Sequence, residues 1–371
     1  MVQSKYGGTN MKLFNDSYKG KKVLITGHTG FKGSWLSLWL KKLGAEVIGY
    51  SLDVPTDPSI FKICSLDERI ISIIGDIRDE ERLKQAFKKY KPDIVFHLAA
   101  QPIVRLSYKE PKATYETNVM GTVNVLEASK GTDSVKAVVV ITTDKCYENK
   151  EWVYGYRETD PMGGYDPYSS SKGCVELVVS AYRNSFYNEK NIGLSSTRAG
   201  NVIGGGDWAE DRLIPDFVKA VSDDKSIIIR NPLATRPWQH VLEPLSGYLC
   251  LGASMLQDNK KYNSGWNFGP EDSDVLNVEQ VLKLAIKSWG KGSIKVDKSQ
   301  QPHEANLLKL DISKAKTYLK WYPVYDVNKA VDATIQWYKA YCENEDMYKY
   351  TLKQIEEYEI EAKIRNLMWS E

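Results

Sequence analysis

The chain has 371 residues, of which 42% are hydrophobic and 26% are charged, an ordinary composition for a soluble globular protein. Fifty basic residues against forty-eight acidic ones give a formal net charge of +2, which does not favour a nucleic-acid-binding or membrane-surface protein. Small-molecule chemistry is the better expectation.

The cysteines and histidines indicate neither disulfides nor a metal. The five cysteines are widely scattered and include no C-x-x-C pair, which predicts a reducing, cytoplasmic setting. The four histidines are not paired at ligand spacing, so no metal site is expected. The first twenty residues lack the apolar core of a signal peptide, and no stretch approaches the ~18 apolar residues of a membrane span.

Short β-rich runs alternate with longer helical patterns after a polar lead-in, residues 1–20, that we expect to be flexible. The predicted strands are 21–27, 45–51, 69–76, 93–100, 136–143 and 192–200. The predicted helices between them are 31–43, 79–91, 111–130 and 168–189. This order predicts an α/β, doubly wound (Rossmann-like) fold with a parallel sheet, which binds ligands beyond the carboxyl ends of its strands.

The regular alternation ends near residue 205, where prolines punctuate shorter elements. Helices are expected near 277–290 and 327–343. We therefore predict one main unit over 21–204, a smaller substrate-capping region over 205–344, and a charged tail with helical spacing over 345–371.

The stretch "LITGHTGFKGSWLSLWL" places Gly27, Gly30 and Gly33 at three-residue spacing, after a strand and at the start of a helix. Glycines there allow a tight turn and let backbone amides approach a pyrophosphate. The spacing is G-x-x-G-x-x-G and not the G-x-G-x-x-G of the dinucleotide fingerprint, so a plain structural turn is the alternative interpretation.

Two acids follow the next two strands. Asp53 lies about twenty residues beyond the glycine turn, where an acid bonds the ribose 2′-hydroxyl of NAD. Its alternative interpretation is a solvated loop acid. Asp76 either reaches the adenine or caps the helix that follows it.

Tyr168 and Lys172, in "YDPYSSSKGCVEL", are four residues apart and so lie on one face of a helix. The same spacing occurs elsewhere, but only Tyr168 follows the fifth strand, where it can face the same cleft as Gly27. A phenol needs about 4 kcal/mol of stabilisation to lower its pKa by ~3 units and act as a base at pH 7. A nearby ammonium and a nicotinamide cation could supply it.

The stretch "ITTDKCY" ends the fifth strand with Thr143, Asp144 and Lys145. In one interpretation the acid and the lysine form a salt bridge at the start of a loop. In the other they are a proton donor and a proton acceptor at one substrate, as an elimination demands and an oxidation alone does not.

With "HLAA" on the fourth strand, these motifs resemble the extended branch of the short-chain dehydrogenase/reductase superfamily over about residues 20–330. The segments "TTDKCY", "YDPYSSSKGCVEL", "TRAGNVIGGGDW", "RLIPD" and "RPWQHVLEPLSGYL" resemble the nucleotide-sugar 4,6-dehydratases, in particular those of CDP-glucose. The resemblance implies dehydration with NAD as a step in deoxysugar biosynthesis: oxidation at C4, loss of water across C5 and C6, and hydride return to C6.

The resemblance also implies roles. Tyr168 would take the C4 hydroxyl proton, Thr143 would bond the C4 oxygen, and Asp144 would protonate the leaving hydroxyl. Related dTDP-glucose enzymes typically carry Glu where this chain has Lys145. The C5 base therefore stays open: Lys145 is either that base or an enolate stabiliser, with Tyr168 handling the proton.

The resemblance further implies two contact sets. The expected NAD contacts are Gly27, Gly30, Phe31, Gly33, Asp53, Asp76, Ile77, Leu98, Ala99, Ala100, Tyr168 and Lys172. The expected substrate contacts are Gln101, Asn201, Arg212, Arg236, Trp238, Gln239 and Glu304. Residues 21–204 would mainly bind NAD and residues 205–344 the nucleotide sugar. A homodimer or homotetramer is expected, paired through helices 111–130 and 168–189, and His97 is expected to be a packed strand residue.

Two other functions remain open. Another NAD-dependent sugar-nucleotide 4,6-dehydratase, or a 4-epimerase of the same fold, would also use Tyr168 and Lys172. An epimerase has no leaving hydroxyl to protonate, so it has no use for Asp144 as an acid. A non-catalytic NAD-sensing binding protein could lose the tyrosine and the lysine without losing the fold.

Overall fold

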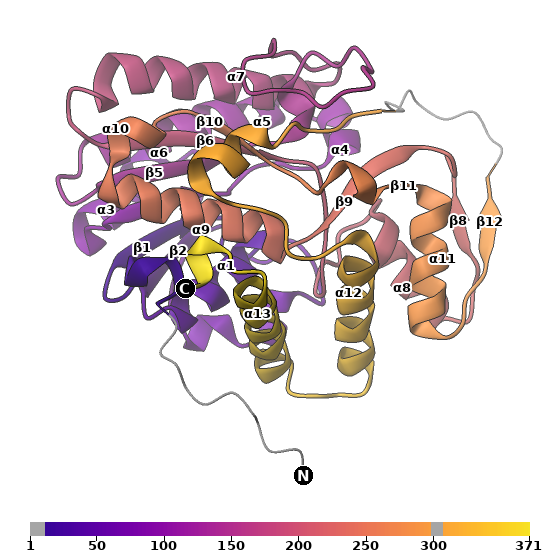
Figure 1. Ribbon diagram of the computed structural model, residues 1–371. Helices are drawn as coiled ribbons and strands as arrows, with labels where there is room; N and C mark the ends of the chain where they lie inside the picture. The colour runs from indigo at the N-terminus through magenta and orange to yellow at the C-terminus, as the bar shows by residue number, and fades with distance from the viewer. Residues whose placement is uncertain (1–11, 298–306) are drawn as a thin grey trace.

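A seven-stranded sheet forms the centre of the computed structural model, which describes residues 12–297 and 307–371. The strand order is β10-β6-β5-β4-β1-β2-β3, and every neighbouring pair is parallel (Figure 1). The strands are β1 (Lys22–Thr26), β2 (Glu46–Ser51), β3 (Ile71–Ile74), β4 (Ile94–His97), β5 (Ala137–Ile141), β6 (Gly193–Ala199) and β10 (Gly265–Phe268). The six strands predicted from the sequence are all present, each shorter than predicted.

Helices cover both faces of this sheet (Figure 1). They are α1 (Phe31–Lys42) and α9 (Leu242–Gln257) on one face, and α3 (Glu80–Tyr90), α6 (Gly121–Lys130) and α7 (Pro167–Tyr182) on the other. Successive strand residues point to opposite faces, so Val23 and Ile25 of β1 join the core that contains α1 and α9. Leu24 joins the second core. The predicted doubly wound α/β fold is confirmed.

The predicted helices are present with small changes at their ends. The 111–130 helix consists of α5 (Pro111–Tyr115), the π-helical η3 (Glu116–Met120) and α6. The π-helical η5 (Arg183–Tyr187) continues α7 in the same way. The later helices are α11 (Val278–Trp289) and α12 (Val327–Cys342).

The chain beyond residue 205 does not form a spatially separate unit. Both β10 and α9 come from it, one as an edge strand of the main sheet and the other as a cover of one face. Tyr248 of α9 packs edge-on against Phe268 of β10, with ring centroids 5.9 Å apart. The sequence did not reveal α9 because nearly all of its residues are buried, and a helix without a polar face shows no amphipathic period.

Elements from the second half of the chain form a smaller region beside the sheet (Figure 1). They are α8 (Leu213–Ser222) with α11 and α12, and the short strands β7 (Asn201–Ile203), β8 (Ile227–Ile229), β9 (Thr235–His240), β11 (Val275–Asn277) and β12 (Ile294–Val296). A capping box starts α11, in which Asn277 and Gln280 each accept a hydrogen bond from the other's backbone amide.

Part of the lead-in expected to be flexible is packed into the core. Phe14, in the short helix η1 (Leu13–Asp16), is 2% exposed. Its ring stacks on Trp369 at 5.0 Å and meets Trp39 of α1 edge-on at 5.9 Å. Tyr18 donates a hydrogen bond to the Leu249 carbonyl at 2.6 Å. Residues 12–20 are therefore part of the folded unit, and residues 1–11 lie outside the described part.

The charged tail forms the helix α13 (Met347–Ile364) and the short helix η8 (Met368–Ser370). The side chain of Glu359 is fully buried and accepts hydrogen bonds from Trp39 Nε1 at 2.8 Å and Lys42 Nζ at 2.6 Å. Thr351 and Gln354 are also buried and bond to α12, where Trp337 Nε1 donates to Thr351 Oγ1 at 2.9 Å and Gln354 Nε2 donates to the Ala333 carbonyl at 2.8 Å. The tail therefore docks on both α1 and α12. Among the described helices, none is long and apolar enough to cross a membrane.

We expect Phe14→Ala to lower the free energy of unfolding by about 3–5 kcal/mol, because it removes a buried ring with two aromatic partners. Urea denaturation followed by tryptophan fluorescence measures this. Lys19→Ala, at an exposed position of the same segment, is the control and should change stability by less than about 0.5 kcal/mol. Equal stability of the two variants would show that the segment is not part of the core.

Candidate functional site

A cavity of about 1910 Å³ lies at the carboxyl ends of the parallel strands. Gly27 follows β1, Leu98 follows β4 and Thr142 follows β5, and all three line it. The opposite wall includes Ile229 of β8 and Trp238 of β9, from the smaller region. Typical ligand pockets measure about 300–1,000 Å³, so this cavity has room for two large ligands.

The glycine turn forms one end of the cavity. Gly27 has φ +80°, and a Cβ there would lie 2.8 Å from the Ala99 amide nitrogen. A Cβ on Gly33 would lie 2.1 Å from the Gly27 carbonyl oxygen. Gly30 starts α1 without a side-chain cap, so the first amides of the helix are left for a ligand. Side chains at Gly27 and Gly33 would collide with neighbouring backbone, so these glycines keep the turn tight. This glycine cradle, with the free amides of α1, fits the pyrophosphate of a dinucleotide.

The acids beyond β2 and β3 also line the cavity. Asp79, and not Asp76, caps α3, so the cap interpretation of Asp76 is wrong. Asp76 pairs with Arg78 at 2.6 Å, and the hydrogen bonds from Arg78 hold the pKa of the carboxyl below its usual value. Asp53 is exposed and accepts a hydrogen bond from the next backbone amide at 2.7 Å. Both interpretations of Asp53 are compatible with this geometry.

The predicted acid–base segment emerges from β5 as the short helix η4 (Asp144–Cys146). Thr143 caps it: its hydroxyl accepts from the Lys145 amide at 3.4 Å and donates to Asp144 Oδ1 at 3.0 Å. Asp144 is 2% exposed, while the Lys145 side chain is 38% exposed and its Nζ lies 3.8 Å from Asp144 Oδ1. The two charges are close but too far apart for a hydrogen bond, and both side chains line the cavity.

Tyr168 is held at the first turn of α7. Asp166 caps this helix by accepting a hydrogen bond from the Ser169 amide at 2.9 Å, and Pro167 occupies the first helical position. Burial raises the pKa of Tyr168 to about 12, although a hydrogen bond with Thr143 lowers it in part.

Lys172 lies one turn further along α7, and its ammonium donates to the Ile141 carbonyl at 3.2 Å. Burial lowers the pKa of Lys172 to about 8. Within the chain, burial of the phenol outweighs the nearby charges. That this lysine and a nicotinamide cation together depress the pKa of Tyr168 stays a prediction.

Four of the expected substrate contacts line the cavity, namely Asn201, Arg212, Arg236 and Trp238. Arg212 Nη1 pairs with Asp207 Oδ2 at 2.6 Å, and this carboxylate raises the pKa of the guanidinium. Arg236 Nη1 donates to the backbone carbonyl of Thr235 at 2.9 Å.

Gln101 is not among the residues that line the cavity. Its Nε2 donates to Thr114 Oγ1 at 2.9 Å, and its Oε1 accepts from the Ile103 amide at 2.6 Å. The side chain thus helps to hold its own turn, and a contact between Gln101 and the sugar stays a prediction.

Gln239 is also absent from the cavity wall. It follows Trp238 on β9, and neighbouring strand residues point to opposite faces, so only one of the two can face the ligand. Its Nε2 donates to the Phe268 carbonyl at 3.3 Å on the far side. The expected contact Glu304 lies outside the described residues.

His97 is a packed strand residue, as predicted. It is 2% exposed, and its ring nitrogens lie 2.6 Å from Thr26 Oγ1 and 2.9 Å from Thr122 Oγ1. Burial lowers its pKa to about 3, so the ring is neutral. Within residues 12–297 and 307–371, no group of three or more His, Cys, Asp or Glu side chains could hold a metal ion.

Sequence reasoning missed Lys32, which lines the cavity between Gly30 and Gly33. Burial, together with the positive charges of Arg212, Lys172 and Lys145, lowers its pKa to about 8, although the negative charge of Asp144 acts against them. Its position inside the glycine turn was a signal, because that turn meets the ends of the other strands. Lys32 therefore adds a cation to the surroundings of the acid–base segment.

Arg105 and Arg230 were missed as well. Both line the cavity, and both pair with Asp211, at 3.1 Å and 3.5 Å. They come from distant parts of the chain, and neither lies in a motif, so only the tertiary structure brings them together.

Comparison with known proteins places this geometry in a family. The family model described as GDP-mannose 4,6 dehydratase matches residues 24–334. A CDP-glucose 4,6-dehydratase from Salmonella typhimurium is 54% identical over 347 residues, which covers 92% of this chain and 97% of that protein.

Solved structures share the fold. A dTDP-glucose 4,6-dehydratase from Bacillus anthracis, in complex with NAD, superposes with a TM-score of 0.72 at 23% identity, covering 90% of this chain and 100% of that one. An epimerase from Methanothermobacter thermautotrophicus gives a TM-score of 0.77 at 24% identity, covering 90% and 96%. With the family match over most of its length, the chain belongs to the GDP-mannose 4,6 dehydratase family, in the extended branch of the short-chain dehydrogenase/reductase superfamily.

Proposed function

We propose that this protein catalyses the NAD-dependent dehydration of CDP-D-glucose to CDP-4-dehydro-6-deoxy-D-glucose. The observation that carries the proposal is that Asp144, Lys145 and Tyr168 line one cavity at the end of β5. An elimination needs a proton donor as well as a proton acceptor, whereas oxidation or epimerisation at C4 has no use for the donor. The name of the Salmonella typhimurium relative supports CDP-glucose as the substrate.

NAD, when bound, would supply a hydride acceptor for C4 and, in its reduced form, a hydride donor for C6. The glycine cradle supports this assignment, because it leaves backbone amides at a helix N-terminus and no room for a side chain. The residues that would hold the cofactor are Gly27, Gly30, Phe31, Gly33, Asp53, Asp76, Ile77, Leu98, Ala99, Ala100, Tyr168 and Lys172.

Tyr168 accepts the proton of the C4 hydroxyl. Its ionised form needs support, since burial raises its pKa to about 12, and Thr143 and Arg212 both act to lower it. Any further positive charge in the cavity adds to that effect. Lys172, which is buried, and Lys32, which is half-buried, are such charges when protonated.

The elimination uses the segment after β5. The C4 ketone acidifies the C5 proton, which Lys145 removes, while Asp144 donates a proton to the C6 hydroxyl and water leaves. Lys145 then returns its proton to C5 as C6 is reduced. A lysine that stays protonated and only stabilises the enolate is the other role open to Lys145.

The protons that Tyr168 and Asp144 exchange with the substrate must be restored before the next cycle. At the end, Tyr168 has gained one proton and Asp144 has lost one. Thr143 interacts with both, because its hydroxyl donates to Asp144 Oδ1 at 3.0 Å and hydrogen-bonds with Tyr168. We propose that Thr143 passes the proton from the tyrosine back to the acid, which restores the starting state.

The pyrophosphate of the nucleotide sugar is assigned to the arginines. Arg212 and Arg236 line the cavity, and a guanidinium fork suits the oxygens of a diphosphate. Asn201 and Trp238 lie on the same wall and complete the proposed substrate contacts.

We also propose a homodimer, or a homotetramer built from it, paired through α5, α6 and α7. Large apolar side chains are exposed along these helices and their π-helical continuations: Tyr115, Met120, Leu177 and Phe186. A second copy of the chain would cover them. The cytoplasmic location stays a prediction from the cysteine pattern, and all five cysteines are free thiols.

We expect the purified protein to convert CDP-glucose to a product that is lighter by one water, with no net formation of NADH. The comparison substrates are dTDP-glucose, UDP-glucose and GDP-mannose, which should not react. Mass spectrometry and absorbance measure the two quantities. An unchanged mass with an inverted C4 centre would make it an epimerase. No reaction with any of the four would favour the non-catalytic binding protein.

We expect Asp144→Asn to lower kcat for dehydration by about 10²- to 10⁴-fold, because the amide keeps the shape of the acid but cannot give up a proton to the C6 hydroxyl. Oxidation at C4 should continue in part, so enzyme-bound NADH should accumulate. Absorbance spectroscopy of the reduced nicotinamide measures this accumulation. Normal turnover by this variant would remove Asp144 as the acid.

Tyr168→Phe should form neither bound NADH nor product, with a loss of about 10²- to 10⁴-fold already in the oxidation step. Stopped-flow absorbance with CDP-glucose resolves that step. Tyr318→Phe, at a tyrosine that is 59% exposed and remote from the cavity, is the matched control and should behave as the wild type. Rapid NADH formation by the Tyr168 variant would contradict its role as the base.

A further inference from the structure

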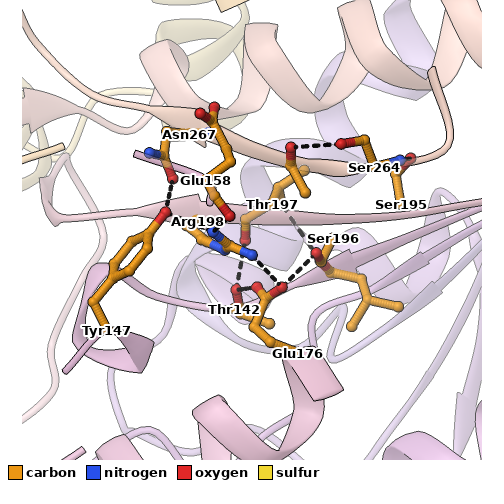
Figure 2. Close-up of polar contacts among 12 residues, drawn as sticks. Thr142, Tyr147, Glu158, Glu176, Ser195, Ser196, Thr197, Arg198, Ser264 and Asn267 are labelled. Atoms are coloured by element: carbon orange, nitrogen blue, oxygen red, sulfur yellow. Dashed lines mark hydrogen bonds and ion pairs between the residues drawn. The ribbon is translucent and has the colours of Figure 1, made fainter. Parts of the chain in front are cut away.

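A buried ion pair lies directly behind the acid–base segment. Arg198 of β6 and Glu176 of α7 meet at 2.8 Å, with side chains that are 5% and 4% exposed (Figure 2). Neither residue is among those that line the cavity, so the pair touches neither ligand. Burying two charges costs free energy unless both groups are fully hydrogen-bonded. The hydrogen-bond partners of this pair therefore indicate what the pair holds in place.

The carboxylate half of the pair binds one end of the segment. Thr142 is the residue before Thr143, and its Oγ1 donates a hydrogen bond to Glu176 Oε1 at 2.5 Å. Ser196 Oγ donates to the other carboxylate oxygen, Oε2, at 2.6 Å. Burial alone would raise the pKa of Glu176, but Arg198 and these hydrogen bonds outweigh it and hold the pKa below its usual value. Glu176 is therefore a permanent anion.

The guanidinium half of the pair binds the other end. Arg198 Nη1 donates to the Tyr147 hydroxyl at 2.5 Å, and that hydroxyl donates to Asn267 Oδ1 at 2.8 Å (Figure 2). The guanidinium also lies 4.9 Å from the centroid of the Tyr147 ring. Tyr147 is thereby fixed in both position and orientation.

We propose that Glu176 and Arg198 are positioning residues that clamp the segment 142–147 at both ends and so hold Asp144 and Lys145 against Tyr168. Thr142 and Tyr147 are bound to opposite halves of one buried pair, and only residues 143–146 lie between them. The segment cannot shift without leaving a buried polar group unpaired. The inference rests on the proposed function for its catalytic consequence, although the clamp itself is a structural claim.

The pair also reaches Lys172. Glu176 lies one turn after this lysine on α7, and its negative charge raises the pKa of Lys172, which burial has lowered to about 8. The other titratable groups around the ammonium are Cys146 on η4, Lys32 on α1 and His97 on β4. Loss of the Glu176 charge would lower the pKa of Lys172 further, so the lysine would lose its proton at a lower pH.

Thr142→Val and Tyr147→Phe each remove one hydroxyl of the clamp and keep the shape of the side chain. We expect kcat for CDP-glucose to fall on the order of 100-fold in each, with KM little changed, because the catalytic groups move and the nucleotide contacts do not. Glu359→Gln is the matched control: it neutralises another buried, paired carboxylate, on α13, and should keep the wild-type kcat.

Glu176→Gln tests the charge. We expect the alkaline limb of its kcat–pH profile to move to lower pH, since Lys172 then deprotonates earlier, whereas Glu359→Gln should leave the limb in place. A folded Glu176→Gln holoenzyme with an unshifted limb would overturn the link to Lys172. If this variant does not fold, Thr142→Val and Tyr147→Phe still decide the clamp.

Hydrogen–deuterium exchange of the peptide that spans 142–147 gives a readout independent of activity. The clamp predicts faster exchange there in Thr142→Val and Tyr147→Phe holoenzymes, and wild-type exchange in Glu359→Gln. Wild-type kcat together with wild-type exchange in the two clamp variants overturns the inference. If the wild type itself does not dehydrate CDP-glucose, the proposed function fails, while the exchange rates still test the clamp.

Discussion

The parallel direction of all seven strands is the constraint on which the site depends. Because every carboxyl end opens on the same edge, the glycine turn after β1, the acid–base segment after β5 and the start of α7 meet in one cavity. Segments more than a hundred residues apart in the chain thus become neighbours. The smaller region closes the cavity from the opposite side, while α9 and β10, which also come from the chain beyond residue 205, belong to the main sheet and its cover.

Burial shapes the chemistry of the ionisable groups at this edge. It raises the pKa of Tyr168 to about 12 and lowers the pKa values of Lys32 and Lys172 to about 8. The tyrosine is thereby a weak acid in the protein alone, while the two lysines exchange protons near neutral pH. Ionisation of Tyr168 then needs further positive charge in the cavity, which suits a reaction that begins only when its ligands are in place.

Much of this arrangement was predictable from the sequence, because the strands, the glycine turn and the Tyr168–Lys172 pair follow local periodicity and motif spacing. The side chains that long-range packing decides were not. The face of β9 to which Gln239 points could not be read from the neighbouring sequence, and neither could the hydrogen bond of Gln101 within its own turn. The charged neighbours of Lys32 and the pairing of Glu176 with Arg198 depend on other strands of the sheet, so no local pattern predicts them.

The two ends of the described chain are joined by packing. Phe14 near the start stacks on Trp369 near the end, and both contact Trp39 of α1, the helix that follows the glycine turn. That face of the sheet is therefore complete only when Trp369 is in place between Phe14 and α1. Loss of the Trp369 ring would take an aromatic partner from both Phe14 and Trp39, so packing far from the cavity supports the helix that begins at the glycine turn.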